Sequence, residues 1–252
     1  MYMRFVRLKL DEDKLWLARR FYEDRALGVL GDTPGCLFVG LLQSSIHGDE
    51  IVSMTVWDGA ESAAEYERSG LFDRLLDESD ESMQEAGDGR ADIQDPDGLV
   101  VFSGVEPDVE SGTVAAGSDD RILSDAASGR IFVRLVAVRL RPGAEQEFER
   151  RYESEVRATL AEMPGCLDSF LVVGSGDSGR VLSVTLWERE EDAVRYGLSG
   201  EFERLTDRLE DLFSDLYQWN LGAADETAGG RGASRPEPDV DGYHLVVGRR
   251  LR

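Results

Sequence analysis

Residues 34–37 read Pro-Gly-Cys-Leu, and residues 164–167 read Pro-Gly-Cys-Leu again, 130 positions later. The same offset continues without a gap well beyond Trp57 and its counterpart Trp187. Self-similarity at a fixed spacing is the sequence signature of a repeated structural unit. The sequence therefore predicts two copies of one module within a single chain.

A second match joins the start of the two copies at a different spacing. Phe5-Val6-Arg7-Leu8 recurs as Phe132-Val133-Arg134-Leu135, at an offset of 127. The difference of three residues predicts a short insertion near Arg141-Pro142-Gly143, where a turn tolerates extra residues. In this alignment Arg7 and Arg134 are equivalent positions of the two copies.

The repeat divides the chain into two domains and a linker. Residues 1–105 are expected to form the first module, residues 106–128 the linker, and residues 129–252 the second module. An acidic, glycine-rich insertion is expected within the second module at residues 222–241. The linker and the insertion are rich in Gly, Ser, Ala and Asp and poor in large apolar side chains, a composition typical of flexible connections.

Hydrophobic periodicity predicts the order strand, helix, strand, strand, helix, strand in each module. The strands of the first module are expected at residues 4–10, 36–44, 51–57 and 99–102, and the last strand of the second module at 244–247. An antiparallel sheet of four such strands, with both helices on one face, is the ferredoxin-like arrangement. In the second module, one long apolar stripe from Val194 and Leu198 to Leu216 predicts a single second helix.

The strand at residues 51–57 presents apolar side chains on both of its faces. Val52, Met54 and Val56 alternate with Ile51 and Trp57, which lie on the opposite side. The helices can cover one face, so we expect the second module to cover the other. The predicted fold class is therefore α+β, with two ferredoxin-like modules packed sheet to sheet as a dimeric α+β barrel inside one chain.

The chain is strongly acidic, with 51 Asp and Glu residues against 28 Lys and Arg residues and a net charge of -23. Such a surface repels phosphate backbones, which excludes nucleic acid as a partner. No apolar run approaches the ~18 residues of a membrane span. Two interpretations of the acidity stay open: adaptation to a salty cytoplasm, which we favour because acidic residues crowd the helices, and compositional bias with acidic disordered loops.

The expected compartment is the cytoplasm. Cys36 and Cys166 are the two cysteines of the chain, which is too few for a disulfide framework. No charged and then apolar leader opens the sequence at Met1. Since two histidines and two cysteines lie far apart in the sequence, no metal-binding spacing is present and no metal site is expected.

Residues 163–167, Met-Pro-Gly-Cys-Leu, and residues 184–193, Val-Thr-Leu-Trp-Glu-Arg-Glu-Glu-Asp-Ala, resemble the antibiotic biosynthesis monooxygenase family. The stretch from Thr33 to Ala63 resembles it too. The resemblance implies a dimeric α+β barrel, built here as a pseudo-dimer that could pair further into a homodimer. It also implies a monooxygenase without a cofactor, whose partners are a small aromatic or quinol-type compound and molecular oxygen.

The resemblance implies a substrate pocket in each module, although only the tryptophans at the strand ends match the family. Serine replaces the family's Asn, and Ala63 and Ala193 replace its helix Tyr. The candidate pocket residues are Trp57, Trp187, Ser53, Ser183, Tyr66, Tyr196, Arg7 and Arg134. Each has a structural alternative: core packing for the aromatic residues, backbone hydrogen bonding for the serines and ion pairing for the arginines.

Two further functions are weighed against the monooxygenase. The heme-degrading branch of the family needs an Asn on the first strand and a His on the second helix. This sequence has Lys9 or Val136 near the first position and Leu76 or Thr206 near the second, so neither heme binding nor heme degradation is expected. A non-catalytic protein that binds a small ligand, or a stress-related one, stays open as the alternative.

Overall fold

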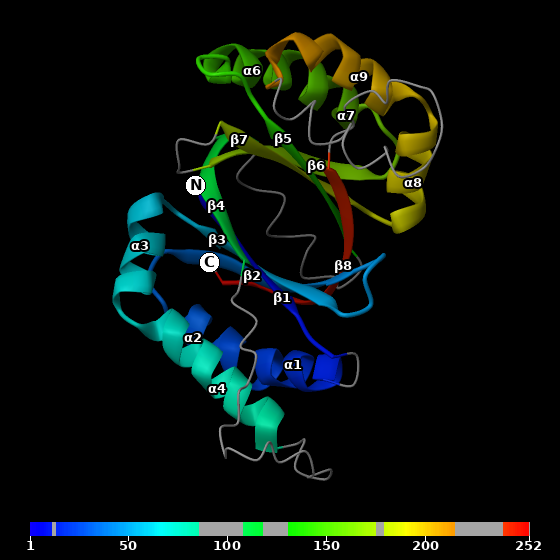
Figure 1. Ribbon diagram of the computed structural model, residues 1–252. Helices are drawn as coiled ribbons and strands as arrows, with labels where there is room; N and C mark the ends of the chain where they lie inside the picture. The colour runs from blue at the N-terminus through cyan, green and yellow to red at the C-terminus, as the bar shows by residue number, and fades with distance from the viewer. Residues whose placement is uncertain (12–13, 86–107, 118–130, 175–178, 215–238, 252) are drawn as a thin grey trace, which may run out of the picture.

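The computed structural model describes residues 1–11, 14–85, 108–117, 131–174, 179–214 and 239–251 (Figure 1). The strands in these ranges are β1 (Tyr2–Lys9), β2 (Cys36–Ser44), β3 (Glu50–Trp57), β4 (Asp108–Ala116), β5 (Phe132–Arg139), β6 (Cys166–Gly174), β7 (Arg180–Trp187) and β8 (Asp239–Arg250). They form one closed antiparallel barrel in the order β1-β3-β2-β8-β5-β7-β6-β4. The expected α+β class and the shared barrel are confirmed.

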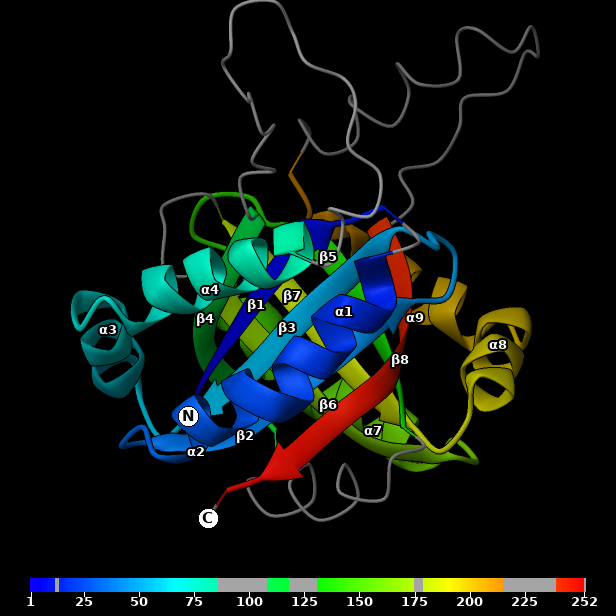
Figure 2. The same cartoon turned by 90° about the horizontal axis from the view of Figure 1, so that it is seen from below.

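The helices form two layers on opposite outer sides of the barrel (Figures 1 and 2). The first layer contains α1 (Leu15–Phe21), η2 (Tyr22–Ala26), α2 (Leu27–Gly31), α3 (Ala60–Arg68) and α4 (Leu71–Glu85). The second contains α6 (Glu145–Arg151), η4 (Tyr152–Arg157), α7 (Ala158–Ala161), α8 (Glu190–Leu198), α9 (Glu201–Leu209) and the 3-10 turn η5 (Glu210–Leu212). In both layers a wide π-helical turn, η2 or η4, interrupts the first helix at the same place.

Strands β4 and β8 close the barrel because each pairs with both halves of the chain. β4 pairs with β1 and with β6, and β8 pairs with β5 and with β2. A sheet that closes on itself leaves no strand edge exposed. The two halves therefore share one continuous hydrogen-bonded wall.

The position of β4 corrects the expected linker at residues 106–128. Residues 108–116 of that segment form a strand, while the strand expected at 99–102 lies outside the described residues. Only Gly112 of β4 is buried, so backbone pairing and not apolar burial holds the strand in place. The strand expected at 244–247 lies within β8, which begins inside the final residues of the insertion expected at 222–241.

The pairing of β1 and β5 corrects the alignment of the two copies. Arg4 pairs with Thr55 on β3, and Arg134 pairs with Thr185 on β7. Since the two threonines are 130 positions apart in sequence, Arg4 and Arg134 are the equivalent residues. The equivalence of Arg7 with Arg134 is wrong, and no insertion of three residues separates the copies.

The two apolar faces of β3 pack against different parts of the protein, as expected: one faces the barrel interior and the other faces the helices. Val52, Met54 and Val56 belong to the cluster of buried side chains that fills the barrel. Ile51 and Trp57 belong to a separate cluster between the sheet and the first layer of helices. The barrel interior is thus a packed core, and the space between sheet and helices is where a pocket can form.

The expected single second helix of the second half is wrong, because α8 ends and α9 begins anew around Gly200. This glycine has a φ of 77°, a left-handed conformation that L side chains rarely adopt, and Gly70 does the same between α3 and α4. The change of direction leaves Val194 exposed and Leu198 84% exposed, although both continue the apolar stripe in sequence. Leu216 lies outside the described residues.

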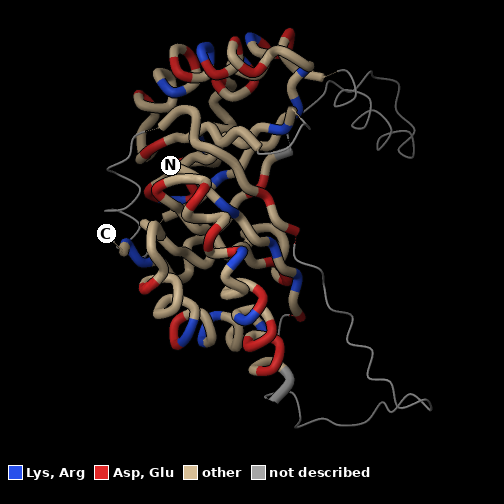
Figure 3. The backbone as a smooth tube through the Cα atoms, turned by 90° about the vertical axis from the view of Figure 1, so that its left-hand side faces the viewer, with Lys and Arg blue, Asp and Glu red and all other residues tan. Residues whose placement is uncertain are grey.

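Charged residues are frequent along the outer helices (Figure 3). In the described part of the chain, the buried charged residues are Arg4, Glu50 and Arg134. None of the described helices combines the length and the apolar character that crossing a membrane requires. Adaptation to high salt stays a prediction.

Candidate functional site

A cavity lies between the sheet and the helices in each half of the protein. The first cavity, between β1 and β3 and the first helix layer, has a volume of about 80 Å³. The second, between β5 and β7 and the second helix layer, has a volume of about 60 Å³. One water molecule needs roughly 10–15 Å³ of such space, so each cavity has room for a group larger than a single water.

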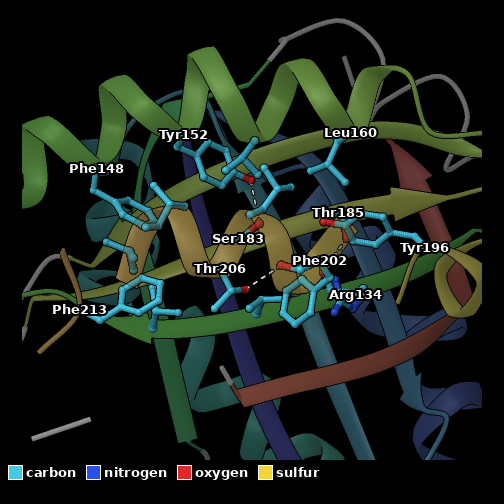
Figure 4. A pocket seen from close by; sticks show the side chains of 16 residues that line it. Arg134, Phe148, Tyr152, Leu160, Ser183, Thr185, Tyr196, Phe202, Thr206 and Phe213 are labelled. Carbon is cyan, nitrogen blue, oxygen red and sulfur yellow. Dashed lines mark hydrogen bonds between the residues drawn. The ribbon is translucent and has the colours of Figure 1, made fainter. Parts of the chain in front are cut away.

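The second cavity is apolar along its length and polar at defined points (Figure 4). Phe148 and Phe213 lie at one end, and Phe202 lies with Arg134 at the other. Ser183 projects from the sheet between the two ends. A flat apolar ligand with one or two polar groups fits this distribution, which is typical of small-molecule sites.

A tyrosine from the π-helical turn is fixed against the floor of each cavity. The Tyr152 hydroxyl donates a hydrogen bond to the Phe170 carbonyl at 3.0 Å and lies 2.7 Å from Ser183 Oγ. Because the phenol has one proton, Ser183 must donate to Tyr152, which leaves the Ser183 oxygen able to accept from a ligand. Tyr22 and Ser53 make the same pair in the first cavity, at 3.0 Å. Such π-helical turns frequently occur at functional sites.

Tyr66 and Tyr196, two of the candidate pocket residues, line the two cavities. Burial raises the pKa of each phenol to about 12. Burial also raises the pKa of Tyr22 and Tyr152, despite their hydrogen bonds to serine. The phenols in the cavities are therefore neutral hydrogen-bonding groups at physiological pH and do not act as bases.

We expect five tyrosines of the folded protein to ionise late in an alkaline titration. The phenols with raised pKa values are Tyr22, Tyr66, Tyr152, Tyr196 and Tyr243. The unfolded chain ionises near pH 10 and these phenols only near or above pH 12, so stability falls as the pH rises past 10. The absorbance of tyrosinate at 295 nm measures this, with the protein in urea as the control. Coincident folded and unfolded curves would contradict the burial.

Arg134 and its counterpart Arg4 line the two cavities and lie over aromatic rings. The guanidinium carbon of Arg134 is 4.2 Å from the centroid of the Phe202 ring, and that of Arg4 is 3.9 Å from Phe72. Stacking of this kind is a favourable cation–π contact. It also holds each guanidinium in place at the wall of its cavity.

Arg7 lies outside both cavities. Its guanidinium is 3.1 Å from Asp241 and 3.7 Å from Glu50, which also accepts a 2.8 Å hydrogen bond from Tyr243. These contacts join β1 to β3 and β8 at one end of the barrel. The ion-pairing interpretation therefore describes Arg7 better than the pocket interpretation.

Trp57 and Trp187 are fully buried beside the cavities and do not line them. The Trp187 indole donates to Thr185 Oγ1 at 2.9 Å, and its ring lies 5.3 Å from that of Tyr196. Trp57 makes the equivalent contacts. The tryptophans therefore pack against the threonine and tyrosine side chains that line the cavities.

The histidines and cysteines do not line the cavities. His47 is exposed in a turn, and His244 lies on β8 beside Glu190, at 3.2 Å. Burial raises the pKa of Cys166 to about 12, so its thiol is unreactive. Within the described ranges, no three His, Cys, Asp or Glu side chains lie together as metal ligands. The absence of heme chemistry stays a prediction.

Sequence reasoning missed several residues of the cavities. Arg4, Tyr22, Tyr152, Phe72 and Phe202 all line one cavity or the other. The offset of 130 already pairs Tyr22 with Tyr152 and Phe72 with Phe202, and extending it to the start of the chain would also have paired Arg4 with Arg134. The letter-for-letter match at offset 127 concealed this last pair.

Comparison with known proteins gives a family for part of the chain and a fold for all of it. Residues 131–208 match the antibiotic biosynthesis monooxygenase family. No curated protein matches the sequence.

Three solved structures share the fold across nearly the whole chain. A proposed monooxygenase from Lactobacillus acidophilus is 10% identical, with a TM-score of 0.60, over 99% of this chain and 96% of that one. One from Fusobacterium nucleatum is 9% identical, with a TM-score of 0.61, over 99% and 94%. An anthrone oxidase-like protein is 12% identical, with a TM-score of 0.60, over 99% and 93%. Identities this low establish a common fold alone.

Proposed function

Because residues 131–208 carry an antibiotic biosynthesis monooxygenase domain, we propose that the protein is a cofactor-independent monooxygenase acting on a small aromatic or quinol-type compound. The observation that carries this proposal is the second cavity, whose walls come mostly from that segment. Its apolar walls fit an aromatic ring. Arg134 offers a positive charge to an ionised oxygen on the ring, and Ser183 Oγ can accept a hydrogen bond from a ring hydroxyl.

The proposed chemistry relies on the substrate as the source of electrons. When a ring CH₂ becomes a carbonyl, the substrate gives four electrons to O₂, one oxygen atom enters the product and the other leaves as water. Among the described residues, the lining of this cavity includes no Asp, Glu, His, Lys or Cys. A substrate that ionises readily is therefore required, and the protein positions it, stabilises its negative charge and excludes water.

We further propose that the barrel is a pseudo-dimer of two equivalent modules. The constant difference of 130 residues supports this, because α1 (15–21) and α6 (145–151), like β3 (50–57) and β7 (180–187), correspond residue by residue. The first module then extends beyond residue 105 to include β4. Pairing of two chains and a cytoplasmic location stay predictions.

The alternative is a protein that binds a small ligand without turnover. It is favoured because the described residues that line the two cavities include no carboxylate, histidine, lysine or cysteine, and because Ala63 and Ala193 stand where the family has a helix tyrosine. The two proposals differ in whether oxygen is consumed.

Oxygen uptake with a panel of hydroxylated polycyclic aromatics tests the proposal. We expect uptake with at least one compound, and one atom of ¹⁸O from ¹⁸O₂ in the product. Arg134→Met is expected to lower the rate at least tenfold, while the matched surface variant Val194→Ala keeps it. Binding without uptake by the folded protein would contradict the monooxygenase and support the alternative.

A further inference from the structure

Three charged side chains are buried in the described part of the protein, and two of them have a partner of opposite charge. Arg4 Nε donates a 2.9 Å hydrogen bond to Glu67. Glu50 lies 3.7 Å from the Arg7 guanidinium and accepts the Tyr243 hydroxyl. Buried charges in proteins are normally paired in this way, because leaving water without compensation is costly.

Arg134 is the third buried charge, and it has no carboxylate partner among the described residues. It is 8% exposed and lines the second cavity, and its guanidinium carbon lies 4.2 Å from the centroid of the Phe202 ring and 5.5 Å from that of Tyr196. Burial lowers the pKa of Arg134, although Tyr196 and the exposed Glu203 oppose the shift. The guanidinium still carries its charge at any physiological pH.

One substitution between the halves accounts for this difference. The position equivalent to Glu67 on α3 is Gly197 on α8, 130 residues later. The surroundings are otherwise retained, since Tyr66 and Phe72 around Arg4 correspond to Tyr196 and Phe202 around Arg134. The second half therefore keeps the buried cation and lacks the side chain that neutralises it.

We propose that the second cavity alone binds an aromatic ligand that carries one negative charge, with Arg134 as the anion-binding residue. In the first cavity the Arg4 guanidinium is already paired with Glu67, so Arg4 adds little to the affinity for an anionic ligand there. One chain then holds one anionic ligand and not two. The inference rests on the proposed function only in taking the second cavity as the ligand site, and it requires no turnover.

The probe is 4-nitrophenol, which ionises near neutral pH and whose anion is yellow. A site that prefers the anion lowers the apparent pKa of the bound dye, so absorbance reports the charge of the ligand directly. We expect the wild-type protein to bind one nitrophenolate per chain and to shift its ionisation to lower pH. Benzoate is expected to displace it, whereas the neutral analogue benzamide is not.

Gly197→Glu tests whether the missing carboxylate at this position is what lets Arg134 bind an anion. Gly197→Gln is its neutral control. A Cβ at Gly197 meets no atom within 4 Å, so either side chain can begin there without a clash at its first atom. We expect Gly197→Glu to weaken nitrophenolate binding at least tenfold and Gly197→Gln to leave it within a factor of three. The reciprocal variant Glu67→Gln is expected to raise the stoichiometry from one to two.

Equal nitrophenolate affinity in folded Gly197→Glu and Gly197→Gln would overturn the inference, as would a stoichiometry of two in the wild type. The same measurements distinguish failure of this inference from failure of the proposed monooxygenase function. Anion binding at one site without oxygen uptake leaves the inference intact and removes the monooxygenase. Oxygen uptake without any preference for the anion keeps the monooxygenase and removes the inference.

Discussion

Replacing Gly112 with valine is expected to lower the free energy of unfolding by roughly 3 kcal/mol or more, because the new side chain collides with backbone. A Cβ at this position would lie 2.1 Å from the carbonyl oxygen of Val173 on β6. That oxygen cannot rotate away as a side chain could. β4 must therefore separate from β6 at one of the seams that close the barrel. Urea unfolding followed by circular dichroism measures the change.

Gly197→Ala is the matched control for Gly112. Its Cβ meets no atom within 4 Å, and it lies in the helix α8. Alanine stabilises a helix interior by up to about 1 kcal/mol relative to glycine, so the control should shift the midpoint in the opposite direction. An unchanged midpoint for Gly112→Val would show that β4 does not pair closely with β6.

Replacing Trp187 with alanine is expected to lower the free energy of unfolding by about 3–5 kcal/mol. The indole is fully buried, packs 5.3 Å from the Tyr196 ring and donates to Thr185. Its removal leaves a cavity and deprives Thr185 of its donor. Thermal and urea unfolding measure the loss, with Leu198→Ala as the exposed control, expected to change stability by less than about 0.5 kcal/mol.

The Trp187 variant also separates a supporting role from a binding role. Because Trp187 lies behind the cavity wall and not in it, Trp187→Phe should restore most of the stability through its volume. It should also leave nitrophenolate affinity nearly unchanged. A loss of affinity in a stable Trp187→Phe variant would instead place the indole against the ligand.

Periodicity in the sequence predicted the parts of the fold that side-chain burial determines. The alternation along residues 51–57 correctly assigned one face to the barrel and one to the helices. It could not find β4, which buries only Gly112 and is held by pairing on both sides. It also extended one helix through Gly200, because an apolar stripe does not record a change of chain direction.

The sequence also predicted part of the candidate site, namely the residues whose direction follows from strand alternation and helix spacing. Ser53, Ser183 and the tyrosines at positions 66 and 196 line the cavities, because strand parity and helix spacing place them facing the same space. Arg4 was missed because four matching letters aligned Arg7 with Arg134 in its place. Arg4 is paired and Arg134 is not because Gly197 stands where the first half has Glu67. The sequence shows this difference only after Arg4, and not Arg7, has been aligned with Arg134.

The pairing of β2 with β8 has a consequence for how the protein is made. Ser44 on β2 is opposite Tyr243 on β8, a strand that leaves the ribosome some 200 residues later. At a synthesis rate of about 5–20 residues per second, the apolar edge of β2 stays unpaired for roughly 10–40 s before β8 is made. An unpaired edge is a template for association with other chains. The nascent chain therefore has to stay apart from its neighbours until translation is nearly finished, and the repulsion between its many carboxylates acts during that whole interval.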